Sequence, residues 1–470
     1  MDAPIIAMLS QLTPQLKTRF CMPGHKGRDG FLPKDINLLD ITEVPGADNL
    51  YMPEGAIRKS QELYAGSVGA REGFFLVNGS SGGIHAAVLA ALQPGDEVIV
   101  ARDVHLCAVN AFVLAGVKPV FVFPSATSVN VPGVVSVLDM QKAINAHPRA
   151  KAVYLTYPNY YGLCADLNGI TAIAHRAGMD VICDAAHAAA FDYSPLLPVT
   201  PAAAGCDIWV SSLHKTLMAM NQCAVLGVGE AAKITHDQVQ SALNMVQTTS
   251  PSYLLLGSAD YALAKMREQG KKQLALVVNI VEDYMRRIEA LGGYRCVLQD
   301  VPADTGAYDR DILKLVIDVT DRGVSGFTAA RLLQQKGITV ETADLSNIVL
   351  ICTVADTSDD FFRLASALGE IKGSNYHIRR AFSAQDLHSV FCLQPTVDMR
   401  SAALAPRRRI PLEKSAGYLS AAAVGAYPPG VPVILPGQEI TKEMIDYLMR
   451  LKNNGYSLFG ENGGIEIACL

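Results

Sequence analysis

Four polar segments of the chain contain side chains that could do chemistry, and each follows a short apolar run. Lys215 lies in DIWVSSLHKTL (207–217), directly after His214. A lysine amine can bond covalently to a carbonyl compound, but a lysine near a helix start is more often a solvated surface residue. Whether Lys215 is a reactive or a surface lysine therefore depends on the other three segments.

Two of these segments contribute a carboxylate and an imidazole. Asp184 ends an apolar run and opens DAAHAAAF (184–191). A carboxylate buried there needs a cationic or hydrogen-bonding partner, although it could also be the N-cap of a following helix. His105 ends RDVH (102–105) after another run. Taken singly, such a histidine is more often packed or solvent-facing than functional.

The fourth segment is Asn78-Gly79-Ser80-Ser81-Gly82-Gly83. Its glycines leave backbone N–H groups accessible, and two hydroxyls with a helix N-terminus would complete a phosphate-binding turn. The segment matches neither G-x-x-x-x-G-K-[ST] nor G-x-G-x-x-G, so it does not indicate a nucleoside triphosphate or a dinucleotide. Alone, it is more typical of an ordinary helix start.

Together the four segments match one cofactor, pyridoxal 5'-phosphate. Lys215 would form an imine with the aldehyde, and Asp184 would keep the ring nitrogen protonated, so that the ring accepts electrons from the substrate's α carbon. His105 would stack on the ring, and a small residue, Ala186, would allow close approach to the other face. The sequence therefore predicts a pyridoxal-phosphate site.

A parallel sheet would position these residues. Short β-branched runs alternate with Ala-rich segments of helical period, and the runs span residues 74–77, 97–100, 120–123, 152–155, 181–183, 208–210 and 224–228. Because the runs are apolar on both faces, they predict a mostly parallel sheet in an α/β domain. Ligands of such sheets bind at the carboxyl ends of the strands, where the four segments lie.

The pattern along the chain predicts four parts. We expect an N-terminal arm (1–60), a large α/β domain (61–265), a small α+β domain (266–385) and a C-terminal domain (386–470). The small domain would hold a helix from about Ser325 to Gln335 and the runs LKLVIDV (313–319), ITVE (338–341) and NIVLIC (347–352). The last part contains the Pro- and Gly-rich YPPGVPVILPG (427–437) and a closing helix.

Composition excludes several classes of protein. Of the 470 residues, 50% are hydrophobic and 18% charged, which favours a large folded core. The net charge of -5 and the absence of basic runs beyond Arg407-Arg408-Arg409 argue against nucleic-acid binding. No apolar run would span a membrane, no signal-peptide order opens the chain, and the ten cysteines form no C-x-x-C pair. We therefore expect a cytoplasmic protein without a metal site.

These segments resemble the Orn/Lys/Arg decarboxylases of pyridoxal-phosphate fold type I, the aspartate-aminotransferase fold. The resemblance covers nearly the whole chain, and its further motifs are FCMPGHKG (20–27), DITEVPGADNLYMPEGAI (40–57), TTSPSY (248–253) and YPPGVPVILPG followed by ITKE. It implies a seven-stranded type of sheet and decarboxylation of arginine, lysine or ornithine. The chain is similar to a short form that lacks the N-terminal wing domain of longer members.

The resemblance also implies roles for individual residues. Lys215 would be the Schiff-base lysine, Asp184 the pyridinium partner and His105 the stacking residue, with Lys215 or His214 returning a proton to the α carbon. Residues implied to hold or neighbour the cofactor are Ser80, Ser81, Gly82, Ala186, His187, Ser212 and His214. Thr248 and Thr249 would contribute at a subunit boundary, because family members are at least dimers with shared active sites.

Three departures from the family pattern leave alternatives open. Leu106 follows the stacking histidine where lysine is usual, Leu213 replaces a threonine before His214, and Gln438 replaces the acidic residue of Pro-Gly-Glu. One alternative is a fold type I aminotransferase or lyase, in which Arg379 or Arg380 would hold the substrate carboxylate. Another is a non-catalytic paralogue that binds pyridoxal phosphate without turnover.

Overall fold

A seven-stranded sheet forms the centre of the chain. The computed structural model describes residues 12–28, 39–124, 131–297, 299, 305–373, 390–427 and 430–469. In spatial order the strands are β2 (Glu72–Leu76), β9 (Ala224–Val228), β8 (Ile208–Ser212), β7 (Asp180–Asp184), β5 (Ala152–Thr156), β3 (Glu97–Ala101) and β4 (Lys118–Val122). Strand β9 runs in the opposite direction to the other six strands and pairs antiparallel with β2 and β8. The prediction of a mostly parallel α/β sheet is confirmed, with strand ends displaced by no more than two residues.

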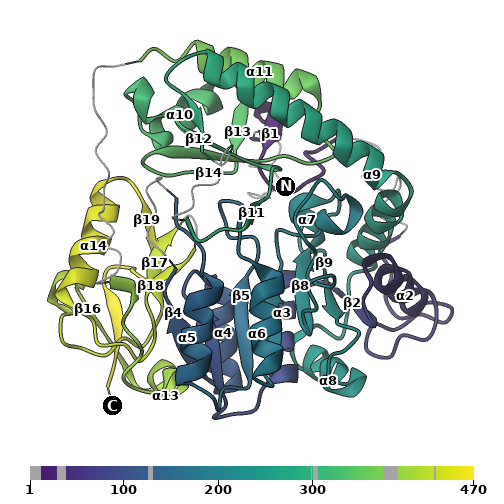
Figure 1. Ribbon diagram of the computed structural model, residues 1–470, viewed down its shortest axis with the longest axis vertical. Coiled ribbons are helices and arrows are strands. Elements are labelled where there is room, and N and C mark those ends of the chain that lie inside the picture. The colour runs from purple at the N-terminus through teal and green to yellow at the C-terminus, as the bar shows by residue number, and fades with distance from the viewer. Residues whose placement is uncertain are drawn as a thin grey trace, which may run out of the picture.

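Helices bury both faces of this sheet, which explains why its strands are apolar throughout. Alternate residues of β3 face opposite sides: Ile99 and Ala101 belong to one hydrophobic cluster, Val98 and Val100 to the other. The first cluster includes α5 (Val137–Ala146), α6 (Leu167–Arg176) and α9 (Tyr253–Ala290). The second includes α3 (Gly79–Ala91), α4 (Leu106–Ala115) and α8 (His236–Val246). Figure 1 shows α5 and α6 on the near side.

A second, smaller sheet lies above the carboxyl ends of the first in Figure 1. Its strands pair antiparallel in the order β10 (Arg295–Cys296), β12 (Lys314–Asp318), β15 (Asn347–Ile351) and β14 (Thr342–Ala343). Helices α10 (Gly326–Gln335) and α11 (Ser358–Gly369) belong to the same unit. Strand β13 (Ile338–Val340) pairs in parallel with β1 (Thr18–Phe20), so the N-terminal segment is anchored on the small unit.

The C-terminal part has its own core beside the β4 edge of the large sheet (Figure 1). It contains two small sheets and a closing helix. Their elements are β16 (Arg407–Ile410), β17 (Val424–Tyr427), β18 (Pro432–Ile434), α14 (Lys442–Asn453), β19 (Ser457–Phe459) and β20 (Ile465–Ala468). Arg379 and Arg380, the candidates for an aminotransferase carboxylate clamp, lie outside the described residues. The predicted domain boundaries stay predictions.

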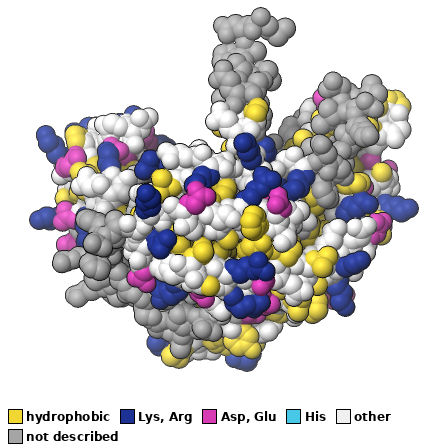
Figure 2. All heavy atoms as spheres, turned by 90° about the horizontal axis from the view of Figure 1, so that it is seen from above, with side chains coloured by type: hydrophobic (Ala, Val, Ile, Leu, Met, Phe, Trp, Pro, Cys, Tyr) yellow, Lys and Arg dark blue, Asp and Glu magenta, His cyan; other side chains and the backbone are white. Residues whose placement is uncertain are grey.

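Charged side chains of both signs are visible on one face of the molecule (Figure 2). On this face, Asp and Glu side chains are scattered among Lys and Arg side chains, and apolar side chains lie between them. Among the described helices, none has the length and apolar character needed to cross a bilayer. Within the same residues no group of His, Cys, Asp and Glu side chains could hold a metal ion. All ten cysteines are free thiols.

The close packing of Gly227 against Trp209 predicts that a larger residue at position 227 destabilises the fold. Gly227 of β9 lies opposite Trp209 of β8, and a Cβ on Gly227 would stand 2.4 Å from the indole ring. Since Trp209 is only 1% exposed and cannot move freely, Gly227→Ala should lower the free energy of unfolding by about 1–3 kcal/mol. Urea unfolding followed by fluorescence measures this change.

Gly257→Ala is the matched control. Gly257 lies on α9 with no atom within 4 Å of its hypothetical Cβ, so alanine there should be neutral or stabilise by up to about 1 kcal/mol. Equal unfolding midpoints for the two variants would contradict the packing argument.

Candidate active site

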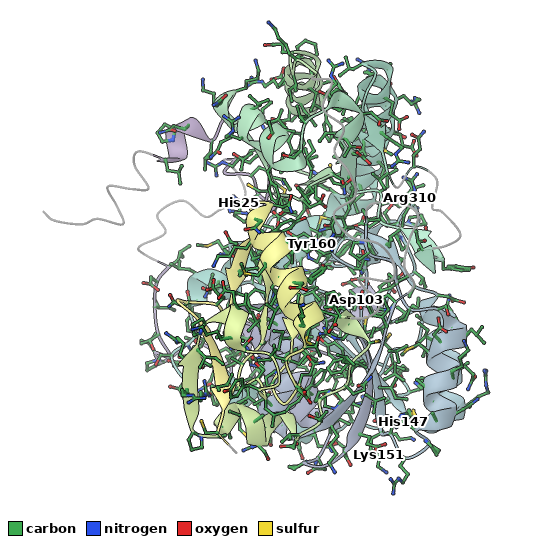
Figure 3. The ribbon with its side chains drawn as sticks, turned by 90° about the vertical axis from the view of Figure 1, so that its left-hand side faces the viewer. His25, Asp103, His147, Lys151, Tyr160 and Arg310 are labelled. Carbon is green, nitrogen blue, oxygen red and sulfur yellow. The ribbon has the colours of Figure 1, made fainter. Side chains whose placement is uncertain are left out.

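The predicted polar segments meet at one edge of the large sheet. Asp184 and Ser212 are the last residues of the adjacent strands β7 and β8, and the segment from Asn78 follows β2. In Figure 3, Asp103 and Tyr160, which follow β3 and β5, lie between this edge and the small unit, whereas Lys151 lies at the opposite end of the sheet. The carboxyl ends of the strands therefore form the candidate site.

Lys215 is held on a single helical turn, α7 (Leu213–Thr216). The backbone N–H of Leu213 donates to Cys223 O at 3.0 Å, which fixes the turn against β9. The Lys215 Nζ atom lies 3.2 Å from His187 Nε2. Burial lowers the pKa of Lys215, while the negative charge of Asp184 opposes that shift. The amine is therefore easier to deprotonate than a surface lysine.

Asp184 is 3% exposed and keeps hydrogen-bonding capacity. Its Oδ1 accepts from the Ala186 backbone N–H at 3.2 Å, and its Oδ2 accepts from the Tyr154 hydroxyl at 3.3 Å. A turn rather than a helix follows β7, so the alternative that Asp184 is a helix N-cap is wrong. Since each carboxylate oxygen has two lone pairs, the group can still accept a hydrogen bond from a ligand.

His105 is the N-cap of α4. Its Nδ1 accepts from the Cys107 backbone N–H at 3.2 Å, so a neutral ring carries its hydrogen on Nε2. The ring is accessible from the open site, yet enough protein surrounds it for desolvation to lower its pKa. Leu106 N donates to Gly430 O at 3.2 Å, and a Cβ on Gly430 would lie 3.2 Å from the His105 ring. The C-terminal part therefore borders the site.

The segment at the start of α3 leaves donors available. Asn78, the N-cap, makes no side-chain capping bond and instead donates from Nδ2 to Val246 O at 2.8 Å. Ser80 is half-buried, Ser81 is exposed, and Gly82 is buried where a Cβ would strike the Asn78 amide at 2.2 Å. Across the edge, the fully buried Ser212 hydroxyl has no hydrogen-bond partner among the described residues. These groups can satisfy an anionic ligand.

His214 is a buried, neutral ring. Its Nδ1 donates to Cys223 O at 3.0 Å, which leaves Nε2 as an acceptor. Burial lowers the pKa of His214 to about 4, so the ring is uncharged at neutral pH. His214 directly precedes Lys215 in sequence, but its Nδ1 bonds to the Cys223 carbonyl. The His187 ring, in contrast, bonds to Lys215.

Thr248 and Thr249 are exposed residues after α8. The preceding Gln247 accepts at Oε1 from Val77 N at 3.1 Å, which ties this stretch to the end of β2. Within the described parts of this chain, neither threonine hydrogen-bonds to Lys215 or Asp184. The predicted role of the two threonines at a subunit boundary stays a prediction.

Three residues near Lys215 were assigned no role from the sequence: Lys314, Tyr160 and Glu341. Lys314 of β12 is 3% exposed, and its Nζ lies 2.7 Å from His187 Nδ1 and 5.3 Å from the centre of the Tyr160 ring. The Tyr160 hydroxyl donates to Glu341 Oε1 at 3.2 Å. The available signal was a lysine inside the apolar run LKLVIDV (313–319), since a buried strand rarely carries one without a partner.

The PGHKG segment packs the site against the small unit. Gly24 N donates to His214 O at 2.7 Å, and the Thr353 hydroxyl donates to Gly24 O at 2.8 Å. Lys26, 6% exposed, donates to Ile351 O at 2.9 Å and has its Nζ 3.9 Å from Asp356 Oδ2. The segment therefore links α7 to the end of β15.

Comparison with known proteins decides the family. Residues 3–305 match the Orn/Lys/Arg decarboxylase major domain, and residues 379–460 match the C-terminal domain of the same family. The chain belongs to the Orn/Lys/Arg decarboxylase family. Arginine decarboxylase of Bacillus subtilis (strain 168) is 31% identical over 475 residues, covering 98% of this chain and 95% of that protein.

Solved structures share the fold of this decarboxylase. The Francisella novicida lysine decarboxylase LdcF superposes with a TM-score of 0.78 at 19% identity, covering 95% of this chain and 78% of that chain. A pyridoxamine-pyruvate aminotransferase from Mesorhizobium loti superposes with a TM-score of 0.53 at 16% identity, covering 68% and 83%. The predicted fold type I architecture is therefore confirmed.

Two of the residues that depart from the family pattern, Gln438 and Leu213, are packed in the interior of this decarboxylase. Gln438 is 1% exposed, donates to Leu393 O at 2.6 Å and accepts from Leu435 N at 2.8 Å, so its amide stabilises the C-terminal part. Leu213 is 1% exposed and belongs to the main hydrophobic cluster. Neither side chain offers a polar group to Lys215.

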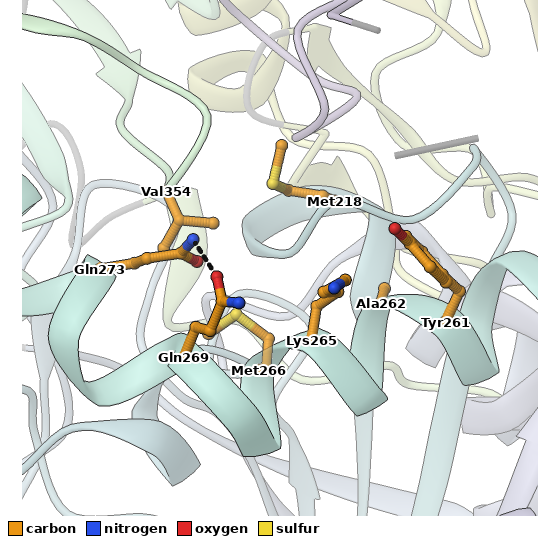
Figure 4. Close-up of a pocket in the computed structure, with 8 residues that line it drawn as sticks. All are labelled: Met218, Tyr261, Ala262, Lys265, Met266, Gln269, Gln273 and Val354. Carbon is orange, nitrogen blue, oxygen red and sulfur yellow. Dashed lines mark hydrogen bonds between the residues drawn. The ribbon is translucent and has the colours of Figure 1, made fainter. Parts of the chain in front are cut away.

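A separate pocket of about 210 Å³ opens beside α9 (Figure 4). Its polar side chains are paired with one another: Gln273 donates to Gln269 at 3.1 Å, and the Lys265 ammonium lies 5.6 Å from the centre of the Tyr261 ring. The candidate site residues lie elsewhere, at the sheet edge.

The contact between PGHKG and α7 gives a prediction. A Cβ on Gly24 would lie 2.2 Å from the Leu217 carbonyl oxygen, at the C-cap of α7. Because Gly24→Ala must displace the turn that carries Lys215, we expect kcat/KM to fall about 10- to 100-fold. Steady-state decarboxylase kinetics measures the loss.

Gly66→Ala, on the exposed face of α2 (Ala56–Val68) with no atom within 4 Å of the added Cβ, is the control and should retain activity. Full activity in Gly24→Ala would show that the segment does not hold α7 in place.

Proposed function

We propose that the chain is a pyridoxal-phosphate-dependent decarboxylase of a basic L-amino acid: arginine, lysine or ornithine. The observation that carries the proposal is the placement of a buried carboxylate, Asp184, and an amine, Lys215, at the ends of neighbouring strands in a member of this family. The products would be carbon dioxide and the corresponding amine, a diamine or agmatine, which are compounds of polyamine metabolism.

The residues at the sheet edge fit pyridoxal 5'-phosphate. The unpartnered Ser212 hydroxyl and the uncapped start of α3 suit its phosphate, with Ser80, Ser81, Gly82 and His214 nearby. The buried Asp184 carboxylate suits a protonated ring nitrogen. The small side chain of Ala186 would leave room beside the ring. When bound, this cofactor supplies a carbonyl that takes up the substrate amine and a ring that accepts the electrons released with carbon dioxide.

The chain's own residues would hold the charges and protons of the reaction. Lys215 would hold the cofactor and release it to the incoming amine. Asp184, oriented by Tyr154 and the Ala186 N–H, would stabilise positive charge on the ring nitrogen. His105 would cover one face of the ring, and His187 would border Lys215. Of the two candidate acids, Lys215 would deliver the proton that replaces the carboxylate, because the neutral His214 ring uses its one N–H to donate to Cys223 O.

We also propose a homodimer with shared active sites, with Thr248 and Thr249 at the boundary. Exposed apolar residues near these threonines support it: Met52 is 71% exposed and Met245 is 68% exposed. The Tyr51 hydroxyl donates to Gln247 O at 2.8 Å, so the segment around Met52 packs beside the threonine stretch. A cytoplasmic location is proposed from the free cysteines, because reducing compartments keep thiols unpaired.

The four-part division of the chain (1–60, 61–265, 266–385 and 386–470) is kept as a proposal. Separate sheets and a separate C-terminal hydrophobic cluster support it.

Lys215→Ala tests the assignment directly. The variant should lose the visible absorbance of the lysine-linked cofactor and should release no carbon dioxide, because no other amine stands at this position. Lys151→Ala, an exposed lysine at the far end of the sheet (Figure 3), should keep both properties. An unchanged visible spectrum in Lys215→Ala would show that another residue binds the cofactor.

The same assay separates the rival functions. Carboxyl-labelled arginine, lysine and ornithine are incubated with the wild-type chain, and labelled gas, amine and keto acid are measured. Gas with amine supports decarboxylation. Keto acid without gas would establish an aminotransferase, and a retained visible band without any product would establish a non-catalytic paralogue.

Asp184→Asn tests the ring-nitrogen partner. Loss of one member of a buried charge pair typically costs about 3–5 kcal/mol, so kcat should fall about 100- to 5000-fold while the visible band persists. Asp180→Asn, at the other end of β7, is the control and should change kcat little. Similar kcat values for the two variants would remove Asp184 from the mechanism.

A further inference from the structure

Three basic nitrogen groups form one row beside the site. The His187 ring lies between two lysines, with Lys314 Nζ 2.7 Å from Nδ1 and Lys215 Nζ 3.2 Å from Nε2. Lys314 and His187 are 3% and 5% exposed. The ring is held edge-on against Tyr160, at 5.7 Å between ring centres. Both hydrogen bonds therefore exist in one fixed arrangement.

Hydrogen counting limits the charge that this row can hold. A neutral imidazole has one N–H donor and one acceptor nitrogen, and an ammonium group can only donate. Two ammonium groups would require the ring to accept at both nitrogens, which a neutral ring cannot do, and two cations this close in a buried site repel each other. One excess proton satisfies both bonds, whichever lysine carries it.

When the row holds one excess proton, its two arrangements differ by a concerted shift of two protons. In one, the Lys215 ammonium donates to Nε2, and the Nδ1 hydrogen is donated to a neutral Lys314 amine. In the other, Lys215 has given its proton to Nε2 while Nδ1 has given its proton to Lys314. The number of protons is unchanged, and Lys215 ends as a neutral amine.

We propose that Lys314 is a positioning residue that takes up the proton of Lys215 through the His187 ring and returns it. The inference rests on the proposed function, because a neutral Lys215 amine is the form that can bond to a carbonyl group. Lys314 thus supplies the site with a place to keep one proton while Lys215 is in its reactive form.

Charged groups from several elements face the row. Asp184 and Glu341 stabilise the ammonium form of Lys215, and Glu341 and Asp311 stabilise that of Lys314, while Lys26 disfavours it. The row also has titratable neighbours in Cys107, His105 and His214. Burial lowers the pKa of Lys314 to about 8, within reach of neutral pH, and lowers that of Lys215. Burial and both lysine charges hold the pKa of His187 well below its usual range.

The test measures the ionisation of Lys215 without its cofactor. The full chain, stripped of pyridoxal phosphate, is treated with trace acetic anhydride across a pH series, and mass spectrometry gives the extent of Lys215 acetylation. In Lys314→Met no ammonium opposes that of Lys215, so the midpoint should rise by about one pH unit, a tenfold smaller fraction of neutral amine. In Lys314→Arg the fixed guanidinium donates to Nδ1, so the midpoint should fall below that of wild type.

A second pair of variants tests the route through the ring. In a His187→Phe background, the midpoints of Lys314→Met and Lys314→Arg should converge, because the hydrogen-bonded connection is gone. An undiminished difference would show that the charge acts through space, and midpoints that match wild type in all variants would overturn the proposal. A merely structural role for Lys314 would slow acetylation equally at every pH.

Failure of the proposed function gives a different result. If the wild-type chain does not take up pyridoxal phosphate at Lys215, that function is wrong, while the acetylation midpoints still report on the row. If wild type takes up the cofactor but the midpoints do not move, only the role of Lys314 is wrong.

Discussion

Asp184 and Lys215 leave neighbouring strands at the same sheet edge, and both are largely removed from bulk water. An isolated charge in such a place costs several kcal/mol, so the surroundings must offer dipoles or opposite charges. The sheet meets part of this requirement with the Tyr154 hydroxyl and the Ala186 N–H at Asp184 and with His187 at Lys215. The hydrogen-bonding capacity that these groups leave unused is available to a charged ligand.

Other parts of the chain pack around this edge. The PGHKG segment joins the turn that carries Lys215 to the small sheet through Gly24 and Thr353. The small unit also brings Lys314 and Glu341 toward the strand ends. From the third direction, Gly430 O accepts a hydrogen bond from the Leu106 N–H, beside His105. Three parts of the chain thus converge on residues from the large sheet, which explains why motifs far apart in sequence occur together.

Much of this arrangement could be predicted from the sequence. The seven apolar runs predicted the strands because burial on both faces removes the usual alternation of polar and apolar residues. Lys215, Asp184, His105 and the start of α3 could be placed at one edge because parallel strands end together. Local patterns carried this information.

Other features depend on contacts that no local pattern encodes. Lys314 lies 127 residues from His187 in sequence, and its position depends on how the small sheet packs on the large one. Tyr154 fits the apolar pattern of β5, so the sequence gives no sign of its contact with Asp184. Its hydroxyl donates to that carboxylate on the neighbouring strand, β7. The order of the strands, with β9 reversed between β2 and β8, likewise follows from tertiary packing rather than from the composition of any run.

The departures from the family pattern gain a physical meaning from the same contacts. A decayed site would be expected to lose groups that face Lys215, yet Gln438 bonds to backbone atoms inside the C-terminal part and Leu213 fills the core under α7. Leu106 contributes its backbone N–H to Gly430. Meanwhile a buried lysine, which is costly to keep, stands one imidazole ring from Lys215. Because burying an amine costs free energy, a chain with no use for Lys314 would be more stable with an apolar residue at this position, so the buried row is easier to understand in a working site.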